Sequence, residues 1–213
     1  MGRLRAIKDA KIKILDSKHC LNQETIKEID VSNKDVYLEI GSGKGDFLIE
    51  KAIKYPDVIF VGFEKFSTVI YKAINKLNAL ENKLNNIFFI NDDATNLLSY
   101  FKLGSISKIF LNFSDPWPKK HHEKNRLTSL NFQSIYKQLL SQDGKVEFKT
   151  DNLALYNYSL DLLKTNRISV LYNTDDLYKD VKNSINSDNV QSEYEKKFIS
   201  KDITIKKIVW KYN

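Results

Sequence analysis

Acidic residues follow several short apolar runs in this sequence, and closely spaced glycines follow the first of these runs. The segment EIGSGKGDF begins with Glu39 and contains Gly41, Gly43 and Gly45. Glycine permits backbone angles and a close approach of a ligand that side chains forbid. The spacing G-x-G-x-G differs from the dinucleotide fingerprint G-x-G-x-x-G, and the segment lacks the G-x-x-x-x-G-K-[ST] pattern of a phosphate loop. We therefore expect a ligand-binding loop that does not hold a pyrophosphate.

The acids around the glycine loop favour a ligand with a positive charge. Glu39 and Asp46 flank the glycines. Glu64 ends the next apolar run, where a carboxylate can accept both ribose hydroxyls of an adenosine. Asp92 or Asp93 follows the third run and could accept a hydrogen bond from the exocyclic amine of adenine. An adenosine next to a cation describes S-adenosyl-L-methionine, which leaves S-adenosyl-L-homocysteine after methyl transfer.

Helix capping is the alternative role for these acids, because a carboxylate at a helix N-terminus accepts from free backbone N–H groups. For Asp46 or Asp92 alone the two roles are equally plausible. The ordered set of Glu39, three glycines, Glu64 and Asp93 favours the cofactor.

The segment NFSDPWPKKHHEKNRL, residues 112–127, joins a carboxylate to a run of basic residues. Pro116 and Pro118 stiffen the backbone near Asp115, and prolines are unsuited to a helix interior or a central strand. We expect a rigid loop whose carboxylate faces the reacting group. The basic side chains fit a phosphate backbone, and they are Lys119, Lys120, Lys124 and Arg126.

Three aromatic side chains in this segment have open roles. Trp117 can stack on a nucleobase or pack the loop into the core, and packing is the commoner role of a tryptophan. His121 and His122 are adjacent and would point in different directions on a helix, so we expect them to be solvated or to contact phosphate. We do not count them among the catalytic residues.

The composition of the 213-residue chain fits a globular protein with a polyanionic partner. Hydrophobic residues make up 42%, and 34 basic against 27 acidic side chains give a net charge of +7. This excess favours nucleic acid, although a lysine-rich chain could carry it without such a partner. Cys20 is the only cysteine, so we expect a reducing compartment and no zinc site or other bound metal. The apolar runs are too short to span a bilayer, which predicts a cytoplasmic protein that does not bind membranes.

Apolar runs of strand length alternate with segments of helical period. The predicted strands cover residues 35–40, 58–63, 86–90, 107–113, 144–150, 168–173 and 203–212. This alternation is typical of an α/β fold with a mostly parallel, seven-stranded sheet and helices on both faces. The alternating last run predicts an antiparallel edge strand. In open α/β sheets, ligands bind beyond the carboxyl ends of the strands, where the glycine loop and the acids lie.

Five segments together resemble the bacterial tRNA (guanine-N7-)-methyltransferase family: EIGSGKGDF, GFEK, NFSDPWPKKHHEKNRL, FKTDN and SEYEKKF. The resemblance runs in order from about residue 34 to the C-terminus. It implies a Rossmann-like, class I S-adenosyl-L-methionine-dependent methyltransferase fold, with residues 34–213 as a single domain. The resemblance assigns nothing specific to residues 1–33, whose segment GRLRAIKDAKIK fits a basic, partly disordered N-terminal arm that contacts tRNA, or a solvated tail. The activity implied is methylation of N7 of a guanosine in the variable loop of tRNA, which forms 7-methylguanosine.

The resemblance also assigns individual residues. The family's cofactor contacts match Glu39, Glu64, Asp93 and Asp115. Its substrate contacts match Lys119, Asp151, Ser192, Glu193, Tyr194 and Glu195. Ser192 departs from the threonine of the family pattern but keeps the hydroxyl. Two alternatives remain, because S-x-x-E also fits a helix capping box and Asp151 could cap the following helix.

The chemistry of guanine N7 limits what the protein must supply. N7 has an in-plane lone pair and no proton, so attack on the methyl group needs no general base. The base becomes cationic, and we expect Asp115 to orient both reactants and stabilise this charge. Asp151 could accept from guanine N1–H and N2–H₂ and so select guanine over adenine. The sequence points to no obligatory protein partner and fits a monomer or a homodimer.

Two other functions stay open from the sequence. A nucleic-acid methyltransferase that acts on an exocyclic amine would carry a related D-P-P-Y loop, but Pro118 follows Trp117 here and the basic run is additional. A non-catalytic RNA-binding module on the same scaffold is disfavoured by the acids at five strand ends.

Overall fold

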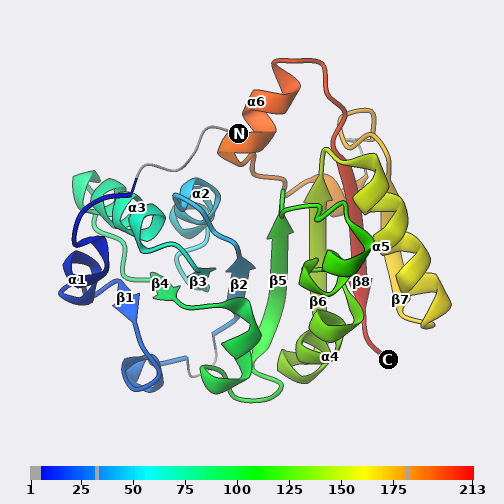
Figure 1. Cartoon of the computed structure of the whole chain (residues 1–213). Coiled ribbons are helices and arrows are strands. Elements are labelled where there is room, and N and C mark those ends of the chain that lie inside the picture. The colour runs from blue at the N-terminus through cyan, green and yellow to red at the C-terminus, as the bar shows by residue number, and fades with distance from the viewer. Residues whose placement is uncertain (1–5, 32–33, 181–182) are drawn as a thin grey trace. The chain divides into compact units, whose positions relative to one another are not determined.

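The computed structural model describes residues 6–31, 34–180 and 183–213, which form two compact units, residues 1–100 and 101–213 (Figure 1). Among the described residues, each unit contains four strands with helices packed against them. All seven predicted strands are present, within a few residues of their expected ends. No helix in the described ranges is both long enough and apolar enough to cross a bilayer.

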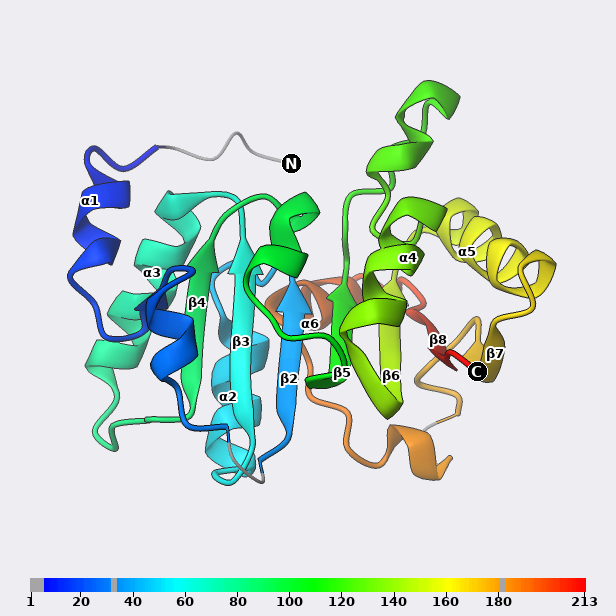
Figure 2. The same ribbon diagram turned by 90° about the horizontal axis from the view of Figure 1, so that it is seen from below.

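The unit of residues 1–100 contains four parallel strands. They are β1 (Cys20–Leu21), β2 (Val36–Ile40), β3 (Ile59–Glu64) and β4 (Ile87–Asn91). β3 lies between β2 and β4, and all six of its residues are buried, as expected for a parallel strand covered on both faces. The helices α2 (Asp46–Lys54) and α3 (Ser67–Ala79) lie on one face of these strands (Figures 1 and 2).

The described part of the predicted N-terminal arm is ordered into three short elements. These are α1 (Ala10–Leu15), β1 and the 3₁₀ helix η1 (Thr25–Glu28). β1 pairs with β4 through Cys20 and Phe89, and α1 packs against α3, so this part belongs to the first unit. The basic residues before position 6 and the expected boundary at residues 32–33 lie outside the described residues.

The unit of residues 101–213 contains β5 (Ile106–Asn112), β6 (Leu140–Thr150), β7 (Ser169–Thr174) and β8 (Lys206–Lys211). β5 and β6 are parallel. β8 is antiparallel to both β6 and β7, which confirms its predicted direction. Its helices are η3 (Lys120–Asn125), α4 (Leu130–Leu139), α5 (Leu153–Thr165), η4 (Ser184–Asn186) and α6 (Glu193–Ile199). Figure 1 shows α5 beside β8 and β7.

The position of β8 corrects the prediction of an edge strand, because it lies between β6 and β7. The alternation that suggested an edge comes from lysines, and these are buried with partners. Lys206 donates to Thr204, and Lys207 forms an ion pair with Glu147 at 3.2 Å. Trp210 is fully buried. A strand that is hydrogen-bonded to a neighbour along both of its backbone edges is not at the edge of the sheet.

Candidate active site

The glycine loop after β2 adopts a conformation that its glycines make possible. The φ angles of Gly41, Gly43 and Gly45 are 77°, 55° and 73°, in the left-handed region that disfavours side chains. A Cβ at Gly41 or Gly43 would meet nothing within 4 Å, whereas one at Gly45 would lie 2.7 Å from the Phe89 ring. The first two glycines therefore leave open space beside the backbone, and the third also permits close packing.

Glu64 connects this loop to the start of α3. Its carboxylate accepts from the N–H of Gly43 at 3.1 Å and from the N–H of Phe66 at 3.0 Å, and the residue is only 8% exposed. Each carboxylate oxygen has a second acceptor position, so ribose hydroxyls can also be accepted. Glu39 lies opposite Gly62 in the β2–β3 pairing and is buried. The Ser42 hydroxyl is buried without a hydrogen-bond partner among the described residues.

The two acids after β4 are engaged locally. Asp93 caps the 3₁₀ helix η2 (Ala94–Ser99) by accepting from the N–H of Thr95 at 3.0 Å. Its other oxygen lies 2.8 Å from the Lys65 ammonium, which is the main reason that its pKa is lowered to about 2. Asp92 accepts from the Tyr100 hydroxyl at 2.9 Å. An adenine amine that donates to Asp93 would therefore share the carboxylate with Thr95 and Lys65, and one that donates to Asp92 would share it with Tyr100.

Asp46, like Asp92, is an acid of the first unit for which the sequence favours neither cofactor binding nor helix capping. It lies in the first turn of α2, and its carboxylate is paired with Lys76 of α3. This contact joins two helices of the first unit. The N-cap of α2 is Gly45 and no side chain in the described ranges caps the helix, so the contact with Lys76 is the interaction that engages the Asp46 carboxylate.

The loop that carries Asp115 contains two strained backbone positions in the second unit. Phe113 and Trp117 have φ angles of 53° and 42°, which are uncommon for residues with side chains and cost on the order of 1–3 kcal/mol each. The Phe113 N–H donates to the carbonyl of Lys149 on β6 at 2.9 Å. Asp115 is exposed, and its carboxylate has no hydrogen-bond or ion-pair partner in the described ranges. The loop thus presents one free carboxylate on a constrained backbone.

The four basic residues of this segment fall into two groups. Lys119, Lys120 and Lys124 are exposed at η3. Arg126 is half-buried, and its guanidinium donates to the carbonyls of Pro116 and Trp117. The lysines can reach a polyanion, whereas the arginine is bound to the loop itself.

The rings whose roles the sequence left open contact one another. Trp117 is half-buried, and its ring meets the His122 ring edge-on at a centroid distance of 5.3 Å. The ring centroids of His121 and His122 are 4.1 Å apart. Trp117 therefore packs against the histidine pair at the protein surface and not into the apolar core.

Asp151 follows β6 and is partly exposed. It does not cap α5, because Asn152 does so by accepting from the N–H of Leu155 at 2.8 Å. Among the described residues, no hydrogen bond or ion pair uses the Asp151 carboxylate. This second acid is therefore available to a ligand.

The SEYE segment divides into two buried and two exposed residues. Ser192 and Glu195 form a capping box at the start of α6. Glu195 is fully buried and accepts from Lys149 at 2.6 Å, from Tyr178 at 2.6 Å and from Asn189 at 3.0 Å. Burial and this carboxylate raise the pKa of Tyr178. Lys149 is not among the residues predicted from the sequence, although a lysine inside an apolar strand is a signal for a buried acidic partner.

The exposed half of the segment carries an aromatic ring and a second acid. Glu193 and Tyr194 are exposed, Tyr194 to 43%. The Tyr194 ring stacks with Phe198 at 6.4 Å, and Phe198 packs against Phe113 at 5.5 Å. The three rings form a cluster that links α6 to the residue just after β5. Tyr194 is its outermost member.

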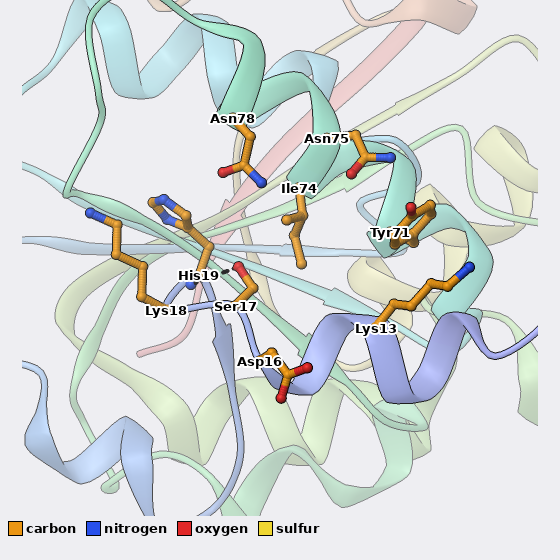
Figure 3. Close-up of a pocket in the computed structure, with 9 residues that line it drawn as sticks. All are labelled: Lys13, Asp16, Ser17, Lys18, His19, Tyr71, Ile74, Asn75 and Asn78. Carbon is orange, nitrogen blue, oxygen red and sulfur yellow. Dashed lines mark hydrogen bonds between the residues drawn. The ribbon is translucent and has the colours of Figure 1, made fainter.

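A separate pocket of about 310 Å³ lies between α1 and α3 in the first unit (Figure 3). Its lining includes Lys13 from α1 and Asn75 and Asn78 from α3, none of which was predicted as a site residue. His19 in its wall is buried with its Nδ1 2.9 Å from the Ile87 carbonyl, and burial lowers its pKa. In the described part of the chain, no group of three His, Cys, Asp or Glu side chains could hold a metal ion.

The sequence matches known proteins over nearly its whole length. A family model described as "Putative methyltransferase" matches residues 33–208. A tRNA (guanine-N(7)-)-methyltransferase of Malacoplasma penetrans is 39% identical over 220 residues, covering 100% of this chain and 99% of that protein. Proteins of the same name from Mycoplasmoides gallisepticum and Pediococcus pentosaceus are 42% and 47% identical. They cover 99% of both chains in the first case, and 81% of this chain and 79% of the relative in the second.

The fold is shared with solved methyltransferases of low sequence identity. An antibiotic-related methyltransferase has a TM-score of 0.62 at 16% identity, covering 89% of this chain and 93% of that chain. The aminoglycoside resistance methyltransferase NpmB1 has a TM-score of 0.60 at 16% identity, covering 91% and 94%. The predicted Rossmann-like, class I methyltransferase fold is therefore confirmed.

Proposed function

The chain belongs to the tRNA (guanine-N7-)-methyltransferase family, and we propose which of its residues bind the substrates and carry out the reaction. It is an S-adenosyl-L-methionine-dependent enzyme that methylates N7 of guanosine in tRNA, forming 7-methylguanosine. The observation that carries this function is the full-length match to enzymes of that name. We place the modified guanosine in the variable loop.

The first unit fits the methyl donor. S-adenosyl-L-methionine supplies a methyl group bound to a positively charged sulfur. The open space beside Gly41 and Gly43 admits a ligand to the backbone, and the unpartnered Ser42 hydroxyl offers it a polar contact. We assign Glu64 to the ribose hydroxyls and the buried Glu39 to the positively charged end of the donor.

Two further residues complete the proposed cofactor set. Gly45 turns the chain into α2 and lets the loop pack against Phe89. Asp93 accepts from the adenine amine while it remains the cap of η2 and the partner of Lys65.

Asp115 is the proposed catalytic residue. Guanine N7 attacks with a lone pair and releases no proton, so a carboxylate is needed for charge and orientation and not as a base. The Asp115 carboxylate is exposed on a constrained loop without a partner in the described residues, which leaves it free to meet a purine that becomes cationic. Its position is fixed by the backbone, so little reorganisation is needed during the reaction.

The proposed guanine contacts come from two segments of the second unit. The free Asp151 carboxylate accepts from N1–H and N2–H₂, which adenine does not offer in this arrangement. Tyr194 offers an exposed ring for stacking, with Glu193 beside it. We propose that the buried Ser192 and Glu195 act on the substrate indirectly, by fixing the start of α6.

The three exposed lysines at η3 form the proposed tRNA phosphate site: Lys119, Lys120 and Lys124. Arg126 is left out of this set because its guanidinium is bonded to the loop backbone. We further propose that the enzyme acts in the cytoplasm as a monomer or homodimer without another protein. Light scattering of the purified protein with and without tRNA measures the oligomeric state.

Nucleoside analysis of the product tests the function. Unmodified tRNA is incubated with the protein and methyl-labelled S-adenosyl-L-methionine, digested to nucleosides and separated. The label is expected in 7-methylguanosine. Label in a nucleoside methylated on an exocyclic amine would favour the other class of nucleic-acid methyltransferase. No label at all, with tRNA still bound, would indicate a non-catalytic RNA-binding protein.

A further inference from the structure

The Arg126 guanidinium is bonded to the backbone of the loop that carries Asp115. Its Nε donates to the Pro116 carbonyl at 3.1 Å and to the Trp117 carbonyl at 3.3 Å, and its Nη2 donates to the Trp117 carbonyl at 3.1 Å. These two carbonyls belong to the residues directly after Asp115. A planar fork of N–H groups can bind both at once, whereas a lysine ammonium is a single point charge on a flexible stem.

The ring of Tyr158, on α5, also contacts this guanidinium. The Arg126 Cζ lies 4.2 Å from the centre of the Tyr158 ring, within the range of a cation–π contact. The Tyr158 hydroxyl donates to the Glu123 carboxylate at 3.0 Å. Burial, followed by this hydrogen bond, raises the pKa of Tyr158 to about 12. The guanidinium thus contacts the Tyr158 ring as well as the two loop carbonyls.

The loop needs such support because its backbone is strained. The left-handed φ angle of Trp117 persists only where the surroundings hold it, and Arg126 binds the carbonyl of this residue with two donors. On the other side of Asp115, the Phe113 N–H is bonded to the Lys149 carbonyl at 2.9 Å. Asp115 thus lies between two anchored points.

We infer that Arg126 is a positioning residue that holds Asp115 in its reactive place, and that it is not a ligand of tRNA phosphate. The inference rests on the role proposed for Asp115. Arg126 differs from the lysines of this segment in its surroundings. Its side chain is half-buried and its guanidinium is hydrogen-bonded to the loop, whereas Lys119, Lys120 and Lys124 are exposed and can reach a phosphate.

Substitution of Arg126 by lysine separates the two roles, because it keeps the charge and removes the fork. Arg126→Lys and Arg126→Ala are both expected to lower kcat about tenfold or more, since small misplacements of a reacting group have effects of this size. The KM for tRNA and the slope of log KM against log salt should stay near wild type. Lys124→Ala should show the reverse, a raised KM and a flatter salt slope with kcat retained. Arg167→Lys, at an exposed arginine after α5, is the matched control and should match wild type.

A structural measurement checks the loop directly. The chain has two tryptophans, and Trp210 is fully buried, so a neutral quencher of fluorescence reports mainly on Trp117. Quenching should increase in Arg126→Lys and Arg126→Ala and stay unchanged in Arg167→Lys, with thermal unfolding confirming that each variant folds. If Arg126→Ala does not fold, Arg126→Lys alone decides the question.

Two results would overturn the inference: wild-type kcat and quenching in Arg126→Lys, or an Arg126→Ala variant whose only defects are a raised KM and a flatter salt slope. Failure of the proposed function looks different. In that case the wild-type protein would form no 7-methylguanosine, while the quenching difference between wild type and Arg126→Lys would remain.

Discussion

The Lys149 ammonium lies 2.6 Å from the Glu195 carboxylate, and neither side chain is exposed to solvent. The pair joins β6 to the first turn of α6. Glu195 matches a family substrate contact, yet its burial keeps it from touching an RNA base. We propose that Glu195 acts on the substrate only by fixing the position of α6, so loss of the pair should lower stability.

Substitution Glu195→Gln should destabilise the protein because it leaves the Lys149 charge without its buried partner. Breaking a buried ion pair from one side typically costs about 3–5 kcal/mol. Urea unfolding measures this loss, and Glu193→Gln on the exposed face of the same turn is the control. Equal stability of both variants would show that the pair does not fix α6.

Glycine at position 45 should matter more for folding than glycine at position 41. Alanine at either position costs about 1–2 kcal/mol in the left-handed region. At position 45 the added Cβ also lies 2.7 Å from the Phe89 ring, whereas at position 41 it meets nothing within 4 Å. The free energy of unfolding should therefore fall further in Gly45→Ala than in Gly41→Ala. The opposite order would mean that the packing at Gly45 relaxes without cost.

The pKa of Asp93 should depend on Lys65. Folding lowers this pKa to about 2, mainly through the Lys65 hydrogen bond. The ionised form therefore stabilises the folded state above the ordinary carboxyl pKa of about 3.9, and the stabilisation is lost as the pH falls toward 2. In Lys65→Met, a carboxyl NMR titration should give a higher pKa for Asp93, while Lys83→Met should leave it unchanged. An unchanged value in Lys65→Met would assign the shift to the Thr95 contacts instead.

Neutralising Lys119, Lys120 and Lys124 together should flatten the salt dependence of tRNA binding. Each lost phosphate contact lowers the slope of log K against log salt by roughly 0.7–0.9, so the slope should fall by about 2–3. A control variant that neutralises the exposed Lys137, Lys145 and Lys164 should keep the wild-type slope. Equal slopes for the two triple variants would remove the lysines of η3 from the tRNA site.

The sequence predicted elements more completely than contacts. Strands and the glycine loop follow local patterns of apolar residues and backbone freedom, which a single sequence displays. The internal position of β8 depends on its pairing with β6 and β7, which no local pattern encodes. The roles of Arg126 and Glu195 also depend on distant partners, Tyr158 and Lys149 respectively. Residue type suggested a phosphate ligand for Arg126, and the family resemblance suggested a substrate contact for Glu195.

The residue that caps α5 could not be predicted from the sequence either. Asp151 and Asn152 are adjacent, and either side chain suits a helix N-cap. The structure gives the cap to Asn152 and leaves the Asp151 carboxylate without a partner in the described ranges. The boundary of a helix shifts by one residue with small differences in backbone geometry, so the sequence left this choice open.

Chemical mapping of the methylated nucleotide, with wild type compared to Asp115→Asn, tests both the product and the role of Asp115. Borohydride–aniline treatment cleaves tRNA at 7-methylguanosine and so gives both the product and its position. Wild type should produce one cleavage, in the variable loop, and Asp115→Asn should do so about 100-fold more slowly with tRNA affinity retained, since an amide lacks the stabilising charge. Cleavage elsewhere, or equal rates for the two proteins, would contradict the account.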